Sequence, residues 1–529
     1  MNTRNAYALR TKAQNSQAQR SRQAGRGSVQ EHAHDHGHHH APYGLGTPAA
    51  TLQTRPADRL LNGEPVLRHP LADRAMNARL AHCEDSVKGR FDAIAPTLRS
   101  LSAQQHLEDF PARAQQIALN QLGYPLPTGI LEDAWVAGLN LKSLYAHCAF
   151  ESLKAAVAQF ARDIKAQLEV VQDTRNFFLD CGYHAVDISP CADGRLKGLS
   201  RYILRLPLTS LTRRKAYAGA LFDVETDLRH WGETELRRFR EGVPTTADAG
   251  TRYLKVAVYH TSSSNPCVEG CAAHGSNETK AIEAALERLN QFRQAIQNAY
   301  CCGANTDILL IGVDTDTDAI KIHIPDSKGE LSAYRFVDNA QLYRDTARMS
   351  ADAARAAVYE AIRTASRKDG WGAGQGEPHD GMRRLIGNLL VNNFSQIEYV
   401  NDLYDGRYPD IGHAERYISV GDGFEEVQMR NVAYYAHLHT LEEGVADMDV
   451  GIKIFKGLNV KHGLPIPVAI HYRYDAKVPG ARDRVAAKAR RVRDAIRARY
   501  PDLAAQGLLA CWLSVQDLPT GSPIETVED

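Results

Sequence analysis

The chain has 529 residues, enough for about three domains of ordinary size. Its 63 basic and 63 acidic residues balance, so no net field favours nucleic acid or a membrane, and 43% apolar with 24% charged residues is typical of a globular protein. The longest strongly apolar run, 308–313, is far below the ~18 residues of a membrane span, and the basic N-terminus is not followed by the apolar stretch of a signal peptide. We therefore expect an intracellular protein whose nine cysteines are thiols or metal ligands.

Residues 1–58 are predicted to form a disordered basic arm. Six Lys or Arg residues and no acid occur in the first thirty positions, among Gln, Asn, Ser and Gly that cannot bury enough apolar surface to offset the chain entropy. The tract HAHDHGHHH at 32–40 contains potential metal ligands. Nothing nearby fixes a coordination geometry, so we favour a solvated low-complexity tract.

Residues 59–165 are predicted to form a helical domain, because apolar residues recur three and four apart from about Leu71 to Val171. Beyond this region, short apolar runs such as YLKVAVYH and DILLIGV are separated by a predicted helix at 277–300. Strand, helix and strand at this spacing favour α/β units on a central sheet, and we place a catalytic domain at 166–412.

A weak internal repeat indicates a duplicated core. ISPCADGR at 188–195 is echoed by YISVGDGF at 417–424, VAVYH at 256–260 by VAIHY at 468–472, and the helix 277–300 with its following strand by the basic helix 481–500 with its following strand. The order is the same in both halves, so we interpret 413–529 as a degenerate second copy. Short echoes of this kind also arise by chance.

The second copy lacks the thiol and the guanidinium of the first. In this alignment Val420 stands where the first copy has Cys191, and Phe424 stands where it has Arg195. Asp422 survives without these partners. We therefore expect no zinc in the second copy.

Two cysteines and a histidine of the first copy form a candidate zinc site. Cys191 follows a predicted strand, His260 ends another, and Cys271 precedes a helix whose N-cap is expected to be Ser276 or Asn277. A helix N-terminus favours the thiolate form of a nearby cysteine. Thiolate sulfur and imidazole nitrogen bind zinc tetrahedrally, and three such ligands leave one position for a catalytic water.

Alternatives remain open for each ligand. Cys191 alone is typical of a buried thiol, and His260 of a core histidine. Cys267 and His274 compete with Cys271 as third ligand, and we favour Cys271 because the two alanines after it would let the backbone approach a metal closely. The other cysteines are expected to be structural thiols: Cys83, Cys148, Cys181, Cys301, Cys302 and Cys511.

Asp193 and Arg195 give this site a charged pair. A metal bound by two thiolates and a neutral imidazole carries no formal net charge, so its water benefits from a nearby acceptor, which Asp193 provides. Arg195 can hold Asp193 off the metal through a two-pronged hydrogen bond. Gly194 is expected to permit the tight turn that lets the two charges face each other.

The combination Cys191-x-Asp193-x-Arg195 with His260 and Cys271 resembles the β-class carbonic anhydrases. Longer segments, FFLDCGYHAVDISPCADGRLKGL, CAAHGSN, GVDTDTDAIKIHIPDSKG and DIGHAERYISVGDGF, resemble the carboxysomal shell carbonic anhydrases of α-type carboxysomes. This similarity covers nearly everything after about Leu71. Ten residues separate His260 from Cys271, whereas ordinary β-class enzymes have two, so Cys267 and His274 stay open as alternatives for the third ligand.

The resemblance implies an α/β catalytic core of β-carbonic-anhydrase type, a degenerate duplicated copy without zinc, and an all-α domain before them. It implies reversible hydration of carbon dioxide to bicarbonate by a zinc-bound hydroxide, with one Zn²⁺ per chain and no organic cofactor. It further implies a homo-oligomer built on dimers inside the carboxysome, where it supplies carbon dioxide to Rubisco. The basic arm is then expected to bind Rubisco or shell proteins.

Two other functions fit parts of the sequence. DILLIGVDTDT resembles the strand and Asp-x-Asp-x-Thr motif of haloacid-dehalogenase-type phosphatases, in which Asp314 and Asp316 would act with Mg²⁺. We favour a polar turn for these carboxylates and for Asp318. The third possibility is a non-catalytic carboxysome scaffold, against which the intact first-copy site argues.

Overall fold

The computed structural model describes residues 60–528, except 62–63, 66–67, 169–176, 208–210, 243–250, 301–304, 368–375, 425–426, 428, 437–440 and 520–521. The predicted arm, its His-rich tract and Cys301–Cys302 lie outside the described residues. Among the described helices, none has the length and apolar character needed to cross a membrane.

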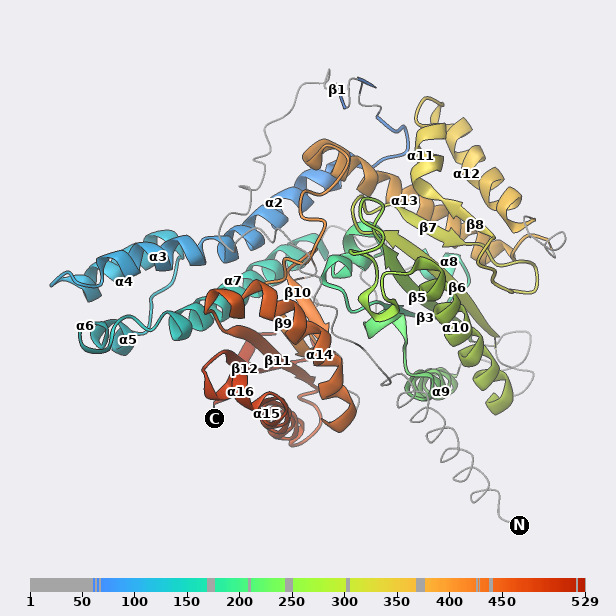
Figure 1. Ribbon diagram of the computed structural model, residues 1–529. Helices are drawn as coiled ribbons and strands as arrows, with labels where there is room; N and C mark the ends of the chain where they lie inside the picture. The colour runs from blue at the N-terminus through green and yellow to red at the C-terminus, as the bar shows by residue number, and fades with distance from the viewer. Residues whose placement is uncertain are drawn as a thin grey trace, which may run out of the picture. The chain divides into compact units, whose positions relative to one another are not determined.

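The N-terminal region is helical, as the apolar spacing predicts. After a short strand pair, β1 Leu60–Leu61 and β2 Glu64–Pro65, come α2 Arg74–Asp92, α3 Ile94–Gln104, α4 Phe110–Gln121, α5 Thr128–Glu132, α6 Ala134–Ala137 and α7 Leu141–Leu168. Leu101, Leu144 and Leu153 are fully buried in the core of these helices. This confirms a helical region ahead of the sheets (Figure 1).

The first sheet has six strands in the order β4-β3-β5-β6-β7-β8. The strands are β3 Ala185–Pro190, β4 Thr212–Arg214, β5 Arg252–Thr261, β6 Asn305–Asp314, β7 Ile320–His323 and β8 Phe336–Asp338. The first four in sheet order run parallel, β7 is antiparallel to β6, and β8 is antiparallel to β7. The central strands β5 and β6 are buried on both faces, which explains their continuous apolar runs.

Helices cover both faces of this sheet (Figure 1). They are α8 Phe177–Asp180, α9 Val224–Arg240, α10 Glu278–Tyr300, α11 Asn339–Thr346, α12 Ala351–Ser366 and α13 Asp380–Tyr404. Leu289 and Phe292 of α10 pack on one face, and Leu389 and Phe394 of α13 belong to the core on the other. Asn277 accepts a hydrogen bond from the Lys280 amide at 3.0 Å, which confirms it as one of the two predicted caps of α10.

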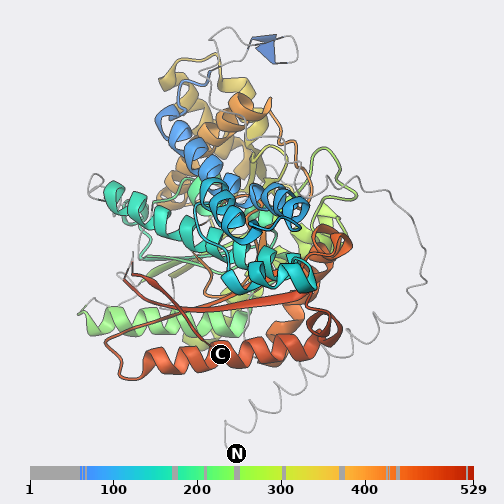
Figure 2. The same cartoon turned by 90° about the vertical axis from the view of Figure 1, so that its left-hand side faces the viewer.

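The second sheet has five strands in the order β10-β9-β11-β12-β13. The strands are β9 Tyr417–Gly421, β10 Ala433–Ala436, β11 Ile466–Tyr474, β12 Leu509–Asp517 and β13 Ile524–Thr526, and the helices are α14 Leu441–Leu458, α15 Ala481–Arg499 and α16 Pro501–Ala505. Side chains alternate along β11: Val468 and Ile470 pack with Val492 of α15, and Ala469 packs with the N-terminal helices. The N-terminal helices and the C-terminal helices therefore lie on opposite sides of these strands (Figure 2).

The two sheets share a strand order. The shared orders are β4-β3-β5-β6-β7 and β10-β9-β11-β12-β13. In each set of five strands, the second in the chain lies at the edge of the sheet and pairs with the first. The third, fourth and fifth strands then follow the first across the sheet. In both sheets the first four strands are parallel and the fifth is antiparallel.

Candidate metal centre

The three candidate ligands lie at one edge of the first sheet. Cys191 directly follows β3, His260 is the penultimate residue of β5, and Cys271 lies in the loop between β5 and α10. Strands β3 and β5 are adjacent and parallel, so their carboxyl ends meet. Open α/β sheets place their ligands at this edge.

The ligand atoms converge in a buried site. One atom from each of Cys191, His260 and Cys271 lies within 4.8 Å of the others, and the two sulfurs are 3.8 Å apart. The three residues are between 1% and 6% exposed. Burying two thiols and an imidazole together is costly unless they share protons or a cation.

The electrostatics make Cys271 the more acidic of the two thiols. The pKa of Cys271 is lowered by a hydrogen bond from Cys191 and by the backbone amides of Ala273 and His274. The pKa of Cys191 is raised well above its usual value by the same sulfur contact and by burial. Burial lowers the pKa of His260, but the charges of Asp193 and Cys191 outweigh it and raise that pKa to about 9.

Asp193 and Arg195 form a bidentate pair beside the cluster. Arg195 donates from Nε to Asp193 Oδ1 at 2.9 Å and from Nη2 to Oδ2 at 2.8 Å. Asp193 Oδ2 is 3.2 Å from Nε2 of His260. Burial raises the pKa of Asp193, but the charges of Arg195 and His260 hold it well below its usual value. The carboxylate therefore stays ionised next to the ligands.

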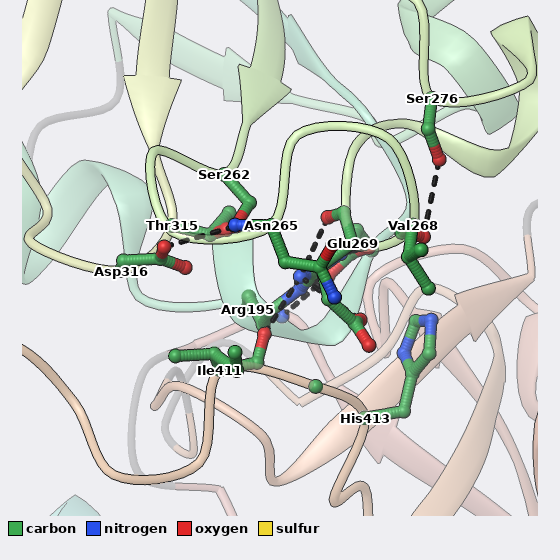
Figure 3. A network of polar contacts seen from close by, with 12 residues as sticks. Arg195, Ser262, Asn265, Val268, Glu269, Ser276, Thr315, Asp316, Ile411 and His413 are labelled. Carbon is green, nitrogen blue, oxygen red and sulfur yellow. Dashed lines mark hydrogen bonds and ion pairs between the residues drawn. The ribbon is translucent and has the colours of Figure 1, made fainter. Parts of the chain in front are cut away.

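Arg195 also ties two distant loops to this pair. It is 1% exposed, and its Nη1 donates to the carbonyls of Glu269 and Ile411, each at 2.9 Å (Figure 3). Glu269 belongs to the loop that carries Cys271, and Ile411 precedes the second sheet. One side chain thus positions the Asp193 carboxylate and both loops.

The competing residues lie elsewhere. Cys267 is exposed, and Nε2 of His274 bonds the carbonyl of Gly219 at 3.1 Å. Neither belongs to the groups of potential metal ligands found among the described residues. Of the other cysteines predicted to be structural, Cys148 and Cys181 are buried, and Cys83 and Cys511 are partly exposed.

The aspartates of the phosphatase-like motif form the turn between β6 and β7. Asp316 is fully buried and accepts hydrogen bonds from Ser262 Oγ at 2.9 Å and the Ser264 amide at 2.7 Å (Figure 3). Asp318 accepts from Tyr408 at 2.7 Å. Asp316 thus anchors the loop that follows His260, and the turn agrees with the predicted polar turn.

Two cavities border the site. A small cavity of about 50 Å³ touches Cys191 and Asp193, and its walls include Ala216, Phe424 and Tyr435. A larger cavity of about 1000 Å³ borders His260 and Cys271. Phe424 and Tyr435 come from the second sheet region, so both halves of the chain shape the surroundings of the candidate ligands.

Comparison with known proteins identifies the family. Three family models match in succession: Carboxysome Shell Carbonic Anhydrase, N-terminal, at 69–161, its catalytic domain at 173–413, and its C-terminal part at 414–529. A carboxysome shell carbonic anhydrase of Halothiobacillus neapolitanus is 58% identical over 466 residues, covering 88% of this chain and 91% of the relative. The chain belongs to the carboxysome shell carbonic anhydrase family.

Other members of this family are also similar along most of their length. The carboxysome shell carbonic anhydrase of Parasynechococcus marenigrum is 48% identical and covers 87% of this chain and 79% of the relative. That of Hydrogenovibrio crunogenus is 43% identical, and the match covers 91% of this chain and 90% of the relative. All five candidate site residues lie in the stretch matched by the family's catalytic-domain model.

Two residues near the site escaped sequence analysis. His413 and Glu415 each bring a side-chain ligand atom within 4.8 Å of an Asp193 oxygen and of each other. They lie at the junction of the family's catalytic and C-terminal models, in the quoted segment DIGHAERY, but no local pattern marks them as site residues. Only the fold brings them to the site.

Glu415 also corrects the expectation for Gly194. Gly194 is not among the described glycines with positive φ, so the turn itself does not demand glycine. A Cβ at this position would lie 2.5 Å from Glu415 Cγ and Oε1, and Glu415 is fully buried. Gly194 is required because the Glu415 side chain occupies the space of a methyl group.

We therefore expect Gly194→Ala to lower stability by ~1–3 kcal/mol, because neither side chain has room to move. Gly89→Ala is the control, since Gly89 is exposed on α2 and its Cβ would meet nothing within 4 Å, and it should stabilise by ~0.5–1 kcal/mol. Thermal unfolding of both variants measures the difference. A Gly194→Ala protein as stable as wild type would show that Glu415 does not constrain this loop.

Proposed function

We propose that the protein is a zinc carbonic anhydrase that hydrates carbon dioxide reversibly to bicarbonate in the α-type carboxysome. The observation that carries the proposal is the buried Cys191, His260 and Cys271 cluster beside the Asp193–Arg195 pair, in a chain of this family. Carbonic anhydrase activity is what the names of its relatives state.

The donor set fits one zinc ion per chain. Two sulfurs each ~2.3 Å from a tetrahedral zinc lie about 3.8 Å apart, which equals the separation of the Cys191 and Cys271 sulfurs. Two soft thiolates with one imidazole are typical zinc ligands and leave a fourth position open. We assign the three ligands as Cys191, His260 and Cys271.

When bound, zinc lowers the pKa of water and so supplies a nucleophile for carbon dioxide at neutral pH. Asp193 is ionised and can accept a hydrogen bond from that water, which orients it. Arg195 occupies both Asp193 oxygens, and this keeps the carboxylate from taking the open position itself. Arg195 therefore positions Asp193 as the acceptor of the hydrogen bond from this water.

The small cavity suits the substrate. About 50 Å³ exceeds the ~10–15 Å³ that one water needs, which gives room for a three-atom molecule. Ala216, Phe424 and Tyr435 contribute apolar surface next to Cys191 and Asp193. The rest of the wall includes Lys197, Arg214 and Asp422, and because carbon dioxide offers little to hydrogen-bond, the apolar part beside Cys191 is sufficient recognition.

We attribute the second sheet to duplication of a β-carbonic-anhydrase-type core, with domains at 59–165, 166–412 and 413–529. The shared strand order supports this origin. Val258 of β5 pairs with Pro190, and its counterpart in the echoed segment of β11, Ile470, pairs with Val420. The next residues are Cys191 and Gly421, so Gly421, rather than Val420, stands at the position of Cys191. Our sequence alignment is therefore shifted by one residue there. Neither residue can bind zinc, and the second copy remains without a metal site.

The other two functions are not favoured. In the phosphatase alternative Asp314 and Asp316 would bind Mg²⁺ and phosphate, but both accept hydrogen bonds from the serines at 262–264. A non-catalytic scaffold would have no reason to keep a buried thiol and imidazole cluster with its charged pair.

We further propose a homo-oligomer built on dimers, placed inside the shell, whose arm at 1–58 binds Rubisco or shell proteins. The first thirty residues of this arm are basic and contain no acid, so they suit acidic surfaces and can order on binding.

Replacing any assigned ligand should abolish zinc binding. Cys191→Ala, His260→Ala and Cys271→Ala should each lose stoichiometric zinc and hydration activity, because two ligands cannot hold the ion against water and chelators. Cys267→Ala is the matched control, since its thiol is exposed, and it should keep both. Metal analysis of purified protein decides; full zinc in Cys271→Ala would refute the assignment of the third ligand.

Asp193→Asn should keep zinc yet lower the hydration rate by ~100-fold or more, since an amide is a poor acceptor for the reacting water. Asp109→Asn is the control, because Asp109 also pairs with an arginine, Arg113, but in the exposed part of the helical region. Stopped-flow hydration assays with zinc analysis on the same samples separate the two effects. Wild-type turnover in Asp193→Asn would remove this carboxylate from the mechanism.

A chain beginning at Arg59 should keep its zinc and hydration rate but lose recruitment to the carboxysome. The isolated arm should bind Rubisco or a shell protein at low salt and release at molar salt, where the Debye length is only about 3 Å. Alanine at the six basic positions between 4 and 26 should weaken binding progressively. Normal encapsulation of the truncated chain would contradict the role of the arm.

A further inference from the structure

The small cavity at the candidate ligands has a charged side as well as an apolar one. The charged side chains in its wall are Asp193, Lys197, Arg214 and Asp422. Arg195 neutralises Asp193 through the bidentate ion pair, so two cations of the wall stand against one carboxylate. The wall therefore carries an excess positive charge, although carbon dioxide itself is neutral.

Lys197 is the buried cation of this wall. It follows the short helix Gly194–Leu196, is 7% exposed, and its Nζ lies 4.8 Å from the centroid of the Tyr435 ring. The face of an aromatic ring is partly negative and stabilises a cation that has lost water. Because both residues line the cavity, the ammonium group and the ring meet at its wall.

Hydrogen bonds to both sheets fix this pair. Arg214 of β4 donates to the Lys197 carbonyl at 2.9 Å and to the preceding carbonyl at 2.8 Å. The Tyr435 hydroxyl donates to the Gly421 carbonyl, and the Tyr435 amide donates to the Ala192 carbonyl at 3.5 Å. Lys197 is thus held between the edge of the first sheet and β10 of the second.

Asp422 only weakly offsets the charge of Lys197. Asp422 is exposed, and its Oδ2 accepts a hydrogen bond from the Arg473 amide at 2.7 Å. Solvent and salt screen an exposed charge much more than a buried one. The buried ammonium group therefore contributes more than this carboxylate to the potential inside the cavity.

Carbonic anhydrase chemistry places an anion where carbon dioxide was. Hydration of one carbon dioxide consumes one water and yields one bicarbonate and one proton, and dehydration consumes that bicarbonate and proton. Burying the negative charge of bicarbonate is costly unless a cation meets it. The apolar wall accounts for the neutral reactant and leaves the anionic one without a partner.

We propose that Lys197 is the bicarbonate-binding residue of the small cavity. Its ammonium group has three donors and donates to the oxygens of bicarbonate, while the apolar wall accepts carbon dioxide. This inference rests on the proposed carbonic anhydrase function and assigns recognition of its anionic reactant to one side chain.

Lys197→Met should weaken bicarbonate and spare carbon dioxide, because it removes the charge and keeps an unbranched apolar chain. The inhibition constant of bicarbonate against hydration should rise about 10-fold, since a charge-assisted hydrogen bond is lost. The KM for carbon dioxide should stay near wild type, because that molecule is neutral. Initial rates at constant pH and ionic strength measure both quantities.

Two variants serve as controls for the loss of charge. Lys197→Arg keeps the charge and should retain most of the bicarbonate affinity. Lys488→Met should behave as wild type, since Lys488 also lies over a tyrosine ring, that of Tyr472 at 4.3 Å, but is exposed on α15 outside the small cavity. Lys197→Gln guards against a folding defect in the methionine variant.

The readout that needs no turnover is thermal unfolding of the zinc-loaded protein with increasing bicarbonate at constant ionic strength. A ligand that binds the folded state raises Tm, so Lys197→Met should need about 10-fold more bicarbonate than wild type for the same rise. Wild-type bicarbonate inhibition and protection in folded Lys197→Met and Lys197→Gln would overturn the proposal, even if the pH profile of hydration shifted. Wild-type protein without zinc or hydration activity would instead refute the proposed function.

Discussion

The buried guanidinium of Arg195 holds together three segments that are far apart in the chain. It occupies both oxygens of Asp193 and bonds the carbonyls of Glu269 and Ile411. A planar group with five donors can do this, and a lysine cannot. The loop carrying Cys271, the loop after β3 and the entry to the second sheet therefore depend on one side chain for their relative positions.

The second sheet gives this arrangement its outer wall. Its strand order repeats that of the first sheet, and in the duplication that we propose Gly421 stands at the position of Cys191 and offers no zinc ligand. Phe424 instead stacks on His471 with ring centroids 4.3 Å apart and borders the small cavity at Cys191. The segment before this sheet also brings Glu415 beside Asp193, so both halves of the chain build the surroundings of the candidate ligands.

The sequence was sufficient for residues whose position follows from local structure. Cys191 and His260 end neighbouring parallel strands, so their convergence could be predicted once the strands were recognised. Asn277 was one of two candidate caps for the same reason. His413 and Glu415 could not be predicted, because they meet Asp193 only through the packing of two sheets and carry no local signature. Gly194 was recognised as a site glycine, but the reason that this position requires glycine was not. The Glu415 side chain, which leaves no room for a methyl group at Gly194, lies more than two hundred residues away in the chain.

The central claim is that hydration of carbon dioxide depends on one zinc ion held by Cys191, His260 and Cys271. Zinc content and carbon dioxide hydration measured on the same purified protein, during stepwise removal of metal by a chelator and its return, test this most directly. The account predicts one zinc per chain and an activity that falls and recovers in proportion to zinc. Full hydration activity in zinc-free protein would contradict it.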